Sequence, residues 1–314
     1  PKRAKPQPAT GIRTMADKNR IDEATGTSTV GHEWDGIEEL DTPMPRWWLF
    51  TFYACIAFAI VYVVLFPAIP MAHDATRGIW NWSSRGDLAA SMKADGARKA
   101  PILSAIAATP IQALPGKPEL MRAAVQGGGA AFKVHCVQCH GSGAAGSKGY
   151  PNLNDDDWLW GGDLRSIEYT ITHGARNPEV AETRTSLMPA FGKDGILTAA
   201  QVQDVVSHIR VISGQEKVSA SATRGAALFE ANCAVCHGPQ GKGMRAFGAP
   251  NLSDRIWLYG GDRASLTQTV TNSRRGVMPA WGHRLDPVTI KMLAVYVHSL
   301  GGGEAAPAER DIPE

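Results

Sequence analysis

The apolar positions of the chain form one long uninterrupted run near the N-terminus. Residues 47–66, WWLFTFYACIAFAIVYVVLF, contain no charged side chain. A helix of about 20 such residues, at about 1.5 Å per residue, matches the hydrocarbon core of a bilayer. Pro67 and Pro70 then end the helix. A buried core helix of this length normally carries a polar face, so we interpret the run as a single transmembrane anchor.

The flanks of this run predict its orientation. Lys18, Arg20 and Arg46 precede it, which favours a cytoplasmic N-terminus. The run is too long for the apolar region of a signal peptide and has no small-residue cleavage site after it, so we expect it to remain as an anchor. Residues 1–14 are basic and rich in proline, and Met15 resembles a translation start. We therefore expect residues 1–14 to be a foreign or processed segment.

An internal repeat fills the second half of the chain. The first copy contains GGAAFKVHCVQCHG, YPNLNDDDWLWGGD and SLMPAFG, and the second contains GAALFEANCAVCHG, APNLSDRIWLYGGD and GVMPAWG. Each copy ends in an amphipathic helical pattern, at 197–212 and 287–300. The predicted fold is all-α, with one N-terminal transmembrane helix followed by two tandem cytochrome c-type haem domains. The predicted divisions are 1–14, a cytoplasmic segment 15–46, the anchor 47–66, a connector 67–121, domain 122–214, domain 221–302 and a tail 303–314.

Cysteine is the informative residue type. The chain has five cysteines, and four of them fall in two C-x-x-C-H patterns. The fifth, Cys55, lies inside the apolar run and is interpreted as a small buried hydrophobe. The net charge of +2 carries no dense basic patch interleaved with aromatic residues, which argues against nucleic-acid binding.

The C-x-x-C-H pattern is typical of covalent haem attachment. Its two thiols lie on one face of a helical turn, where they reach the two vinyl groups of one haem, and the next histidine lies under the iron. Zinc needs a second pair of ligands at matching spacing, and a thioredoxin-like motif needs a βαβ context; the sequence shows neither. The predicted haem-binding residues are Cys136, Cys139 and His140 for one haem c and Cys233, Cys236 and His237 for a second.

The sixth iron ligand is expected from the M-P-A-[FW]-G motifs. Met188 follows the first C-x-x-C-H and Met278 the second, so order along the chain pairs His140 with Met188 and His237 with Met278. A thioether ligand raises the reduction potential. One alternative stays open: His173, which aligns with Asn272 in the second copy, would give a bis-histidine first haem.

Two further pairs of residues follow each attachment motif. In c-type cytochromes the carbonyl of a proline at this position commonly accepts from the ring of the iron-binding histidine, which makes Pro151 and Pro250 candidates for orienting it. Trp158 and Trp257 are candidates for lining the haem propionates, with ordinary core packing as an equal alternative.

The sequence resembles a known family, the dihaem subunit III of cbb3-type cytochrome c oxidases. The stretch GHEWDGIEELDTPMPRWW at 31–48, the anchor and the two haem motifs carry the resemblance, which covers about residues 15–302. It implies that the chain is not an enzyme on its own. It implies electron transfer from a soluble or membrane-bound cytochrome c donor to a monohaem subunit and then to the haem–copper site of the catalytic subunit.

Haem attachment also predicts a location, and two other functions compete with the one that the resemblance implies. C-type haem is attached on the periplasmic side, so both haem domains are expected outside the bacterial inner membrane. Residues 1–14 are a candidate cytoplasmic tail of an upstream partner, such as the cytochrome c1 subunit of a bc1 complex. The alternatives are a dihaem subunit of another membrane dehydrogenase and a dihaem cytochrome c peroxidase, which needs one five-coordinate haem.

Overall fold

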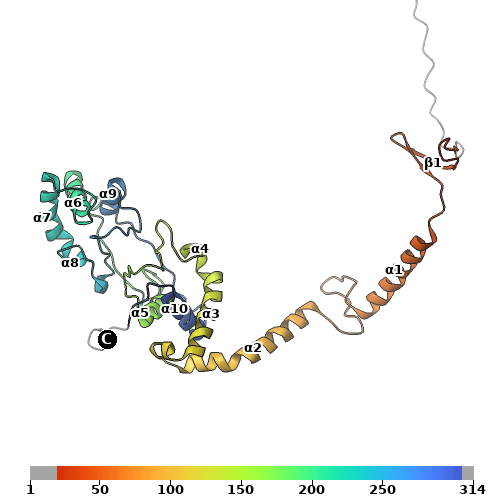
Figure 1. Ribbon diagram of the computed structural model, residues 1–314, viewed down its shortest axis with the longest axis horizontal. Coiled ribbons are helices and arrows are strands. Elements are labelled where there is room, and N and C mark those ends of the chain that lie inside the picture. The colour runs from red at the N-terminus through yellow and green to blue at the C-terminus, as the bar shows by residue number, and fades with distance from the viewer. Residues whose placement is uncertain (1–19, 306–314) are drawn as a thin grey trace, which may run out of the picture. The chain divides into compact units, whose positions relative to one another are not determined.

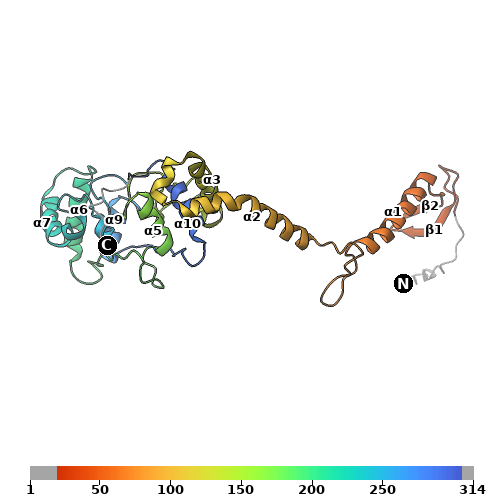
Figure 2. The same ribbon diagram turned by 90° about the horizontal axis from the view of Figure 1, so that it is seen from below.

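The computed structural model describes residues 20–305, which fall into two units. The division lies after Ala94, inside helix α2 (Ser84–Ala108). Figures 1 and 2 show the course of the chain. The segment 1–14 and most of the tail 303–314 lie outside the described residues, so the expectations for them are not tested there.

The first unit begins with a short β-hairpin that the all-α prediction did not include. Strands β1 (Thr29–Trp34) and β2 (Ile37–Leu40) pair antiparallel. Asp35 and Gly36 form the turn, and both have positive φ, at 52° and 85°. Two such residues in succession are the signature of a type I′ turn. The rest of the described chain is mostly helical, as predicted.

Helix α1 (Arg46–Leu65) is the apolar run of the sequence and is a candidate membrane span. None of its side chains is buried in the protein, so its apolar surface on every side requires an apolar environment. At its C-terminal end, the ring of Phe66 packs edge-on against Trp80 and Trp82, with centroids 4.9 and 5.8 Å apart. Such aromatic clusters are common where a helix leaves the bilayer.

Five helices of the second unit begin at a residue whose side chain caps them. Asp163, Thr198, Ser219, Asp262 and Asp286 each accept hydrogen bonds from the first free backbone N–H groups, as N-caps do. The elements are 3₁₀ helices η1 (Ile111–Gly116) and η2 (Arg245–Phe247), and helices α3 (Pro118–His135), α4 (Val137–His140), α5 (Leu164–His173), α6 (Ala199–Ile212), α7 (Ala220–Asn232), α8 (Ala234–His237), α9 (Arg263–Asn272) and α10 (Pro287–His298).

Two hydrophobic cores organise this unit, and each combines both copies of the repeat. The first core joins α3 and α5 to α10 and contains Phe132. The second core joins α6 to α7 and α9 and contains Phe229. Figures 1 and 2 show the blue α10 beside α3 and the green α6 beside α7. The closing helix of each copy therefore packs on the haem-motif helix of the other copy.

Two glycines allow the helices of each core to approach closely. A Cβ on Gly128 of α3 would lie 2.0 Å from the carbonyl oxygen of Met292, and one on Gly225 of α7 would lie 1.9 Å from that of Asp204. Real atoms do not approach this closely, so glycine is required at both positions. Ile106 and Leu114, from the segment expected to be a connector, are also fully buried in the first core.

Candidate functional site

The first attachment motif forms a tight turn at the end of α3. The amide of His140 donates to the carbonyl of Cys136 at 2.9 Å, and Gly141 ends the turn with φ of 79°. The His140 ring nitrogen Nδ1 lies 3.0 Å from the carbonyl oxygen of Pro151. Because a carbonyl only accepts, Nδ1 carries the proton, and Nε2 keeps its lone pair for a metal.

The second motif repeats this geometry. The amide of His237 donates to the carbonyl of Cys233 at 2.9 Å, and His237 Nδ1 lies 2.9 Å from the carbonyl oxygen of Pro250. The role expected for Pro151 and Pro250 therefore agrees with the geometry of both turns. An accepting carbonyl of this kind fixes the tautomer and the ring plane of a metal-ligating histidine.

The protonation states of the motif residues suit metal binding. Burial lowers the pKa of His140 and of His237, against the opposing effect of each proline carbonyl, so both rings are neutral at pH 7. Burial, with the neighbouring cysteine, raises the pKa of Cys136 and of Cys233 to about 11. The raised pKa disfavours the thiolate form that redox exchange and zinc binding require.

A cavity of about 590 Å³ adjoins the second motif. Its volume is in the range of ligand sites. Cys233, Cys236 and His237 line it on one side. Most of its remaining wall is apolar, including Phe191, Val205, Ile209, Phe229, Leu252, Trp257, Leu266 and Val270. Two thiols, a neutral imidazole and an apolar wall fit a flat hydrophobic cofactor with a central metal, so these residues fit haem.

The methionine that faces the second motif comes from the first copy. Met188 lines the cavity of His237 and packs on the second core beside Cys233. Met278, from the second copy, packs on the first core, which also holds Cys136 and Val137. The pairing expected from chain order, His140 with Met188 and His237 with Met278, is therefore not the arrangement in the structure.

Two crossing segments, residues 184–188 and 274–278, produce this exchange. Met278 exchanges backbone hydrogen bonds of 2.9 and 3.0 Å with Ala175, directly after α5 of the first core. The carbonyl of Met188 accepts from the hydroxyl of Ser273, directly after α9 of the second core. Each crossing segment thus leaves one core and delivers its methionine to the other.

The remaining candidate residues, His173, Trp158 and Trp257, lie beside these two cores. The ring of His173 packs at a tilt against Tyr169 with centroids 4.4 Å apart. Met278 packs on the core of Cys136, as do Met121 and Met292, but of these three only Met278 stands in an M-P-A-[FW]-G motif. The Trp158 indole N–H donates to the carbonyl of Gly302 at 2.6 Å, so Trp158 packs in the first core. Trp257 lines the cavity of the second site.

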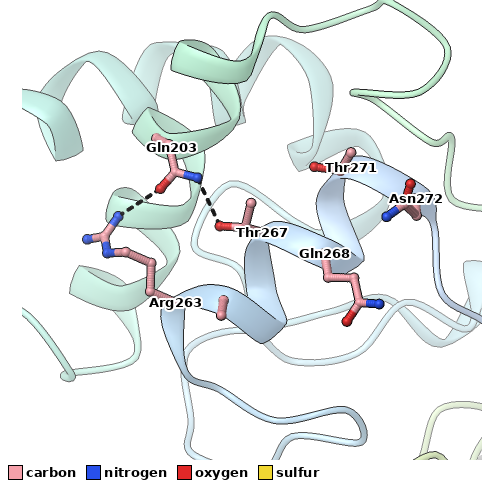
Figure 3. Close-up of a pocket in the computed structure, with 7 residues that line it drawn as sticks. Gln203, Arg263, Thr267, Gln268, Thr271 and Asn272 are labelled. Carbon is pink, nitrogen blue, oxygen red and sulfur yellow. Dashed lines mark hydrogen bonds between the residues drawn. The ribbon is translucent and has the colours of Figure 1, made fainter.

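A separate surface hollow lies between α6 and α9, and Figure 3 shows it. Gln203 donates to Thr267 at 3.1 Å, and Arg263 donates to Gln203 at 3.4 Å. The polar groups of this hollow therefore hold the two helices together. None of the residues that line this hollow belongs to either attachment motif.

Sequence reasoning missed Arg184 and Arg274, which begin the two crossing segments. Each guanidinium lies over an aromatic ring, Tyr169 at 4.5 Å and Tyr259 at 4.7 Å. Aligning the two copies was enough to find them, because both arginines stand at the same distance before their methionines.

Two helical cores, each with a C-x-x-C-H turn, an oriented histidine and a methionine, define a c-type cytochrome. The model described as "Cytochrome C oxidase, cbb3-type, subunit III" matches residues 123–209 and 220–297, and "N-terminal domain of cytochrome oxidase-cbb3, FixP" matches residues 26–73. The chain belongs to the subunit III family of cbb3-type cytochrome c oxidases and serves as an electron-transfer subunit of such an oxidase.

Its curated relatives agree over almost the whole chain. It is 53% identical over 276 residues to the cbb3-type oxidase subunit CcoP of Cereibacter sphaeroides, covering 88% of this chain and 95% of that protein. It is 47% identical over 291 residues to the subunit FixP of Bradyrhizobium sp. and 48% over 292 residues to FixP of Rhizobium meliloti. These alignments cover 92% of this chain and all of each relative. The peroxidase and dehydrogenase alternatives are not favoured.

Proposed function

We propose that the chain carries two covalently bound haems c with exchanged methionine ligands. The first is attached at Cys136 and Cys139, with His140 and Met278 as iron ligands. The second is attached at Cys233 and Cys236, with His237 and Met188. The observation that carries this proposal is Met188, which lines the cavity of His237 although it belongs to the other copy.

The residues of each site favour electron transfer over substrate chemistry. A bound haem supplies a one-electron iron couple, and the thioether of a methionine raises its potential. The hydrogen bond from each histidine to its proline orients the ring, and burial keeps the ring neutral. A histidine and a methionine on each iron leave no position for substrate, so the remaining activity is to receive and pass on electrons.

The proposed partners and topology follow from the family and the anchor. Helix α1 holds the chain in the bacterial inner membrane, with the N-terminus in the cytoplasm and both haem sites in the periplasm. A cytochrome c donor reduces this chain, which passes electrons to a monohaem subunit and then to the haem–copper subunit of the oxidase. Anchoring raises the effective concentration of the sites beside these membrane partners.

Turnover of the assembled oxidase tests this role. Met278→Leu removes a proposed iron ligand, so oxygen consumption driven by reduced cytochrome c is expected to fall sharply. Consumption driven by a small reductant that acts downstream should survive better. Met92→Leu, at an exposed position of α2, is the matched control and should behave as wild type. Full cytochrome c-driven turnover in a Met278→Leu complex that lacks the ligand would contradict the proposed route.

A separate measurement counts the cofactors and checks that the irons are closed. The alkaline pyridine spectrum of the purified chain should show two haems c per polypeptide. Carbon monoxide should bind poorly to the reduced chain, because both irons are six-coordinate. One haem per chain, or stoichiometric carbon monoxide binding at one site, would contradict the proposal.

A further inference from the structure

Arg184, at the start of the first crossing segment, has an unsatisfied side chain. Its guanidinium carbon lies 4.5 Å from the ring centre of Tyr169 and 5.6 Å from that of Trp160. Its Nε is buried and has no hydrogen-bond partner among the described residues. Burial lowers the pKa of Arg184, and the charges of Tyr169 and Asp163 oppose this effect.

The nearby titratable groups are already engaged elsewhere. The carboxylate of Asp163 caps α5 and accepts from the amides of Arg165 and Ser166. The hydroxyl of Tyr169 donates to the carbonyl of Glu182 at 2.8 Å, and the ring of His173 packs at a tilt against the same tyrosine. The structure therefore holds a partly buried cation over two aromatic faces without a carboxylate bonded to it.

The second copy supplies an internal comparison. The equivalent Arg274 stacks on Tyr259 at 4.7 Å, and it is satisfied by α9. It donates to the carbonyl of Ser265 at 2.7 Å, to the hydroxyl of Thr269 at 2.7 Å and to the side chain of Gln268 at 2.9 Å. In the first copy Tyr169 takes the place of Gln268 and offers a ring face instead of an oxygen.

An unsatisfied buried donor needs an explanation in physical terms. Leaving such a donor unpaired costs the free energy of its desolvation, which is larger for a charged group, so native structures contain few of them. A guanidinium that is flat on an aromatic ring is already oriented and presents its fork of donors edgewise. That arrangement is suited to a carboxylate, which accepts two parallel hydrogen bonds.

Arg184 also stands at the edge of the first site. Its amide donates to the carbonyl of Gly174 at 3.1 Å, and its carbonyl accepts from Arg176 at 2.7 Å. The residue between them, Ala175, pairs with Met278. Paired extended segments lie about 4.8 Å apart, so only the segment of Ala175 separates Arg184 from the backbone of the proposed iron ligand Met278.

We propose that Arg184 binds a propionate carboxylate of the haem attached at Cys136 and Cys139 and so raises the reduction potential of that site. This inference rests on the proposed two-haem function. The cation makes the oxidised iron, which carries one more positive charge, less favourable. It also keeps the carboxylate ionised across the neutral pH range. Arg184 is a positioning residue here, because it acts on the iron through the carboxylate.

The test is a redox titration of the full-length chain in detergent, at several pH values. Arg184→Gln should lower one of the two midpoint potentials, and the same potential should fall in Met278→Leu. In Arg184→Gln it should also decrease as pH rises through neutrality, because the carboxylate now titrates. Arg184→Lys keeps the charge and should remain close to wild type. Arg165→Gln, at an exposed position of α5, is the matched control and should change neither value.

Two results overturn the inference, and they differ in what they imply. If Arg184→Gln binds both haems and keeps the wild-type potentials and pH profile, Arg184 only packs, and this inference alone fails. If the wild-type chain lacks a covalent haem at the first motif by the pyridine spectrum, the proposed function fails with it. If Arg184→Gln does not accumulate, Arg184→Lys decides. Its haem carboxylate vibrations in resonance Raman spectra should shift from wild type, and unchanged vibrations would overturn the inference.

Discussion

Met188 and His237 line one cavity although they belong to different copies of the repeat. The same exchange brings Met278 to the core of Cys136. Each core therefore contains residues of both copies, and dividing the chain between the copies would remove a proposed iron ligand and a packing helix from each site. The unit of folding in this part of the chain is the pair of copies.

A truncation tests this dependence. A chain that ends after Gly214 keeps the first motif but loses Met278 and α10, which packs on α3. We expect it to lack methionine ligation and to unfold far more easily than the full chain. The absorption band of methionine-ligated ferric haem and far-UV circular dichroism report these two properties. A stable truncated chain with a methionine-ligated haem would show that the first copy folds alone.

Gly225 offers a test of the packing between α6 and α7. Gly225→Ala places a methyl group where the carbonyl oxygen of Asp204 lies 1.9 Å away, so the helices must separate. Overpacking of this kind costs about 1–3 kcal/mol, and we expect a loss in that range in denaturant unfolding. Gly96→Ala, in α2 with open space around it, is the control and should gain up to about 1 kcal/mol. Equal effects of the two variants would contradict the close approach.

Asp157 predicts a pH dependence of stability. Burial, reinforced by Asp254, Asp155 and Asp156, raises its pKa to about 6, and Arg245 opposes the shift. A carboxyl whose pKa is raised by folding contributes stability below its unfolded value near 4, and this contribution is lost as pH rises through about 6.

Asp157→Asn keeps a neutral side chain at every pH. It should match wild type near pH 4 and exceed it at pH 8 by about 1 kcal/mol, since solvent screens part of the full shift. Thermal unfolding at the two pH values measures this difference, with the exposed Glu230→Gln as the control. A gain that is equal at both pH values would show that folding does not raise the pKa of Asp157.

Reporter fusions test the topology. A reporter that is active only outside the cytoplasm should be active after Gly303 and silent near Asp17. The physical reason is that the candidate span α1 is proposed to cross the bilayer once, with Arg46 at its cytoplasmic end. The opposite pattern of activity would overturn both the positive-inside argument and the assignment of the haem sites to the periplasm.

The sequence was sufficient for local features and insufficient for the exchange. The anchor follows from the uninterrupted apolar run and the closing helices from hydrophobic periodicity. The turns at His140 and His237 follow from C-x-x-C-H, and each of these features depends on neighbouring residues alone. Asp35-Gly36 is also a turn signal in the sequence, and it indicates the hairpin that the all-α prediction omits. The core on which each methionine packs depends on the course of the crossing segments. The two copies share their motifs, so the sequence does not indicate which core receives which methionine.

The long-wavelength absorption band of methionine-ligated ferric haem, measured in chains with a single haem, tests the exchanged ligation most directly. Cys233→Ala with Cys236→Ala leaves only the haem of the first motif. In that background we predict that Met278→Ala abolishes the band and Met188→Ala preserves it. Cys136→Ala with Cys139→Ala should give the reverse. Loss of the band with Met188→Ala and its retention with Met278→Ala, while the first haem alone is present, would contradict the exchange.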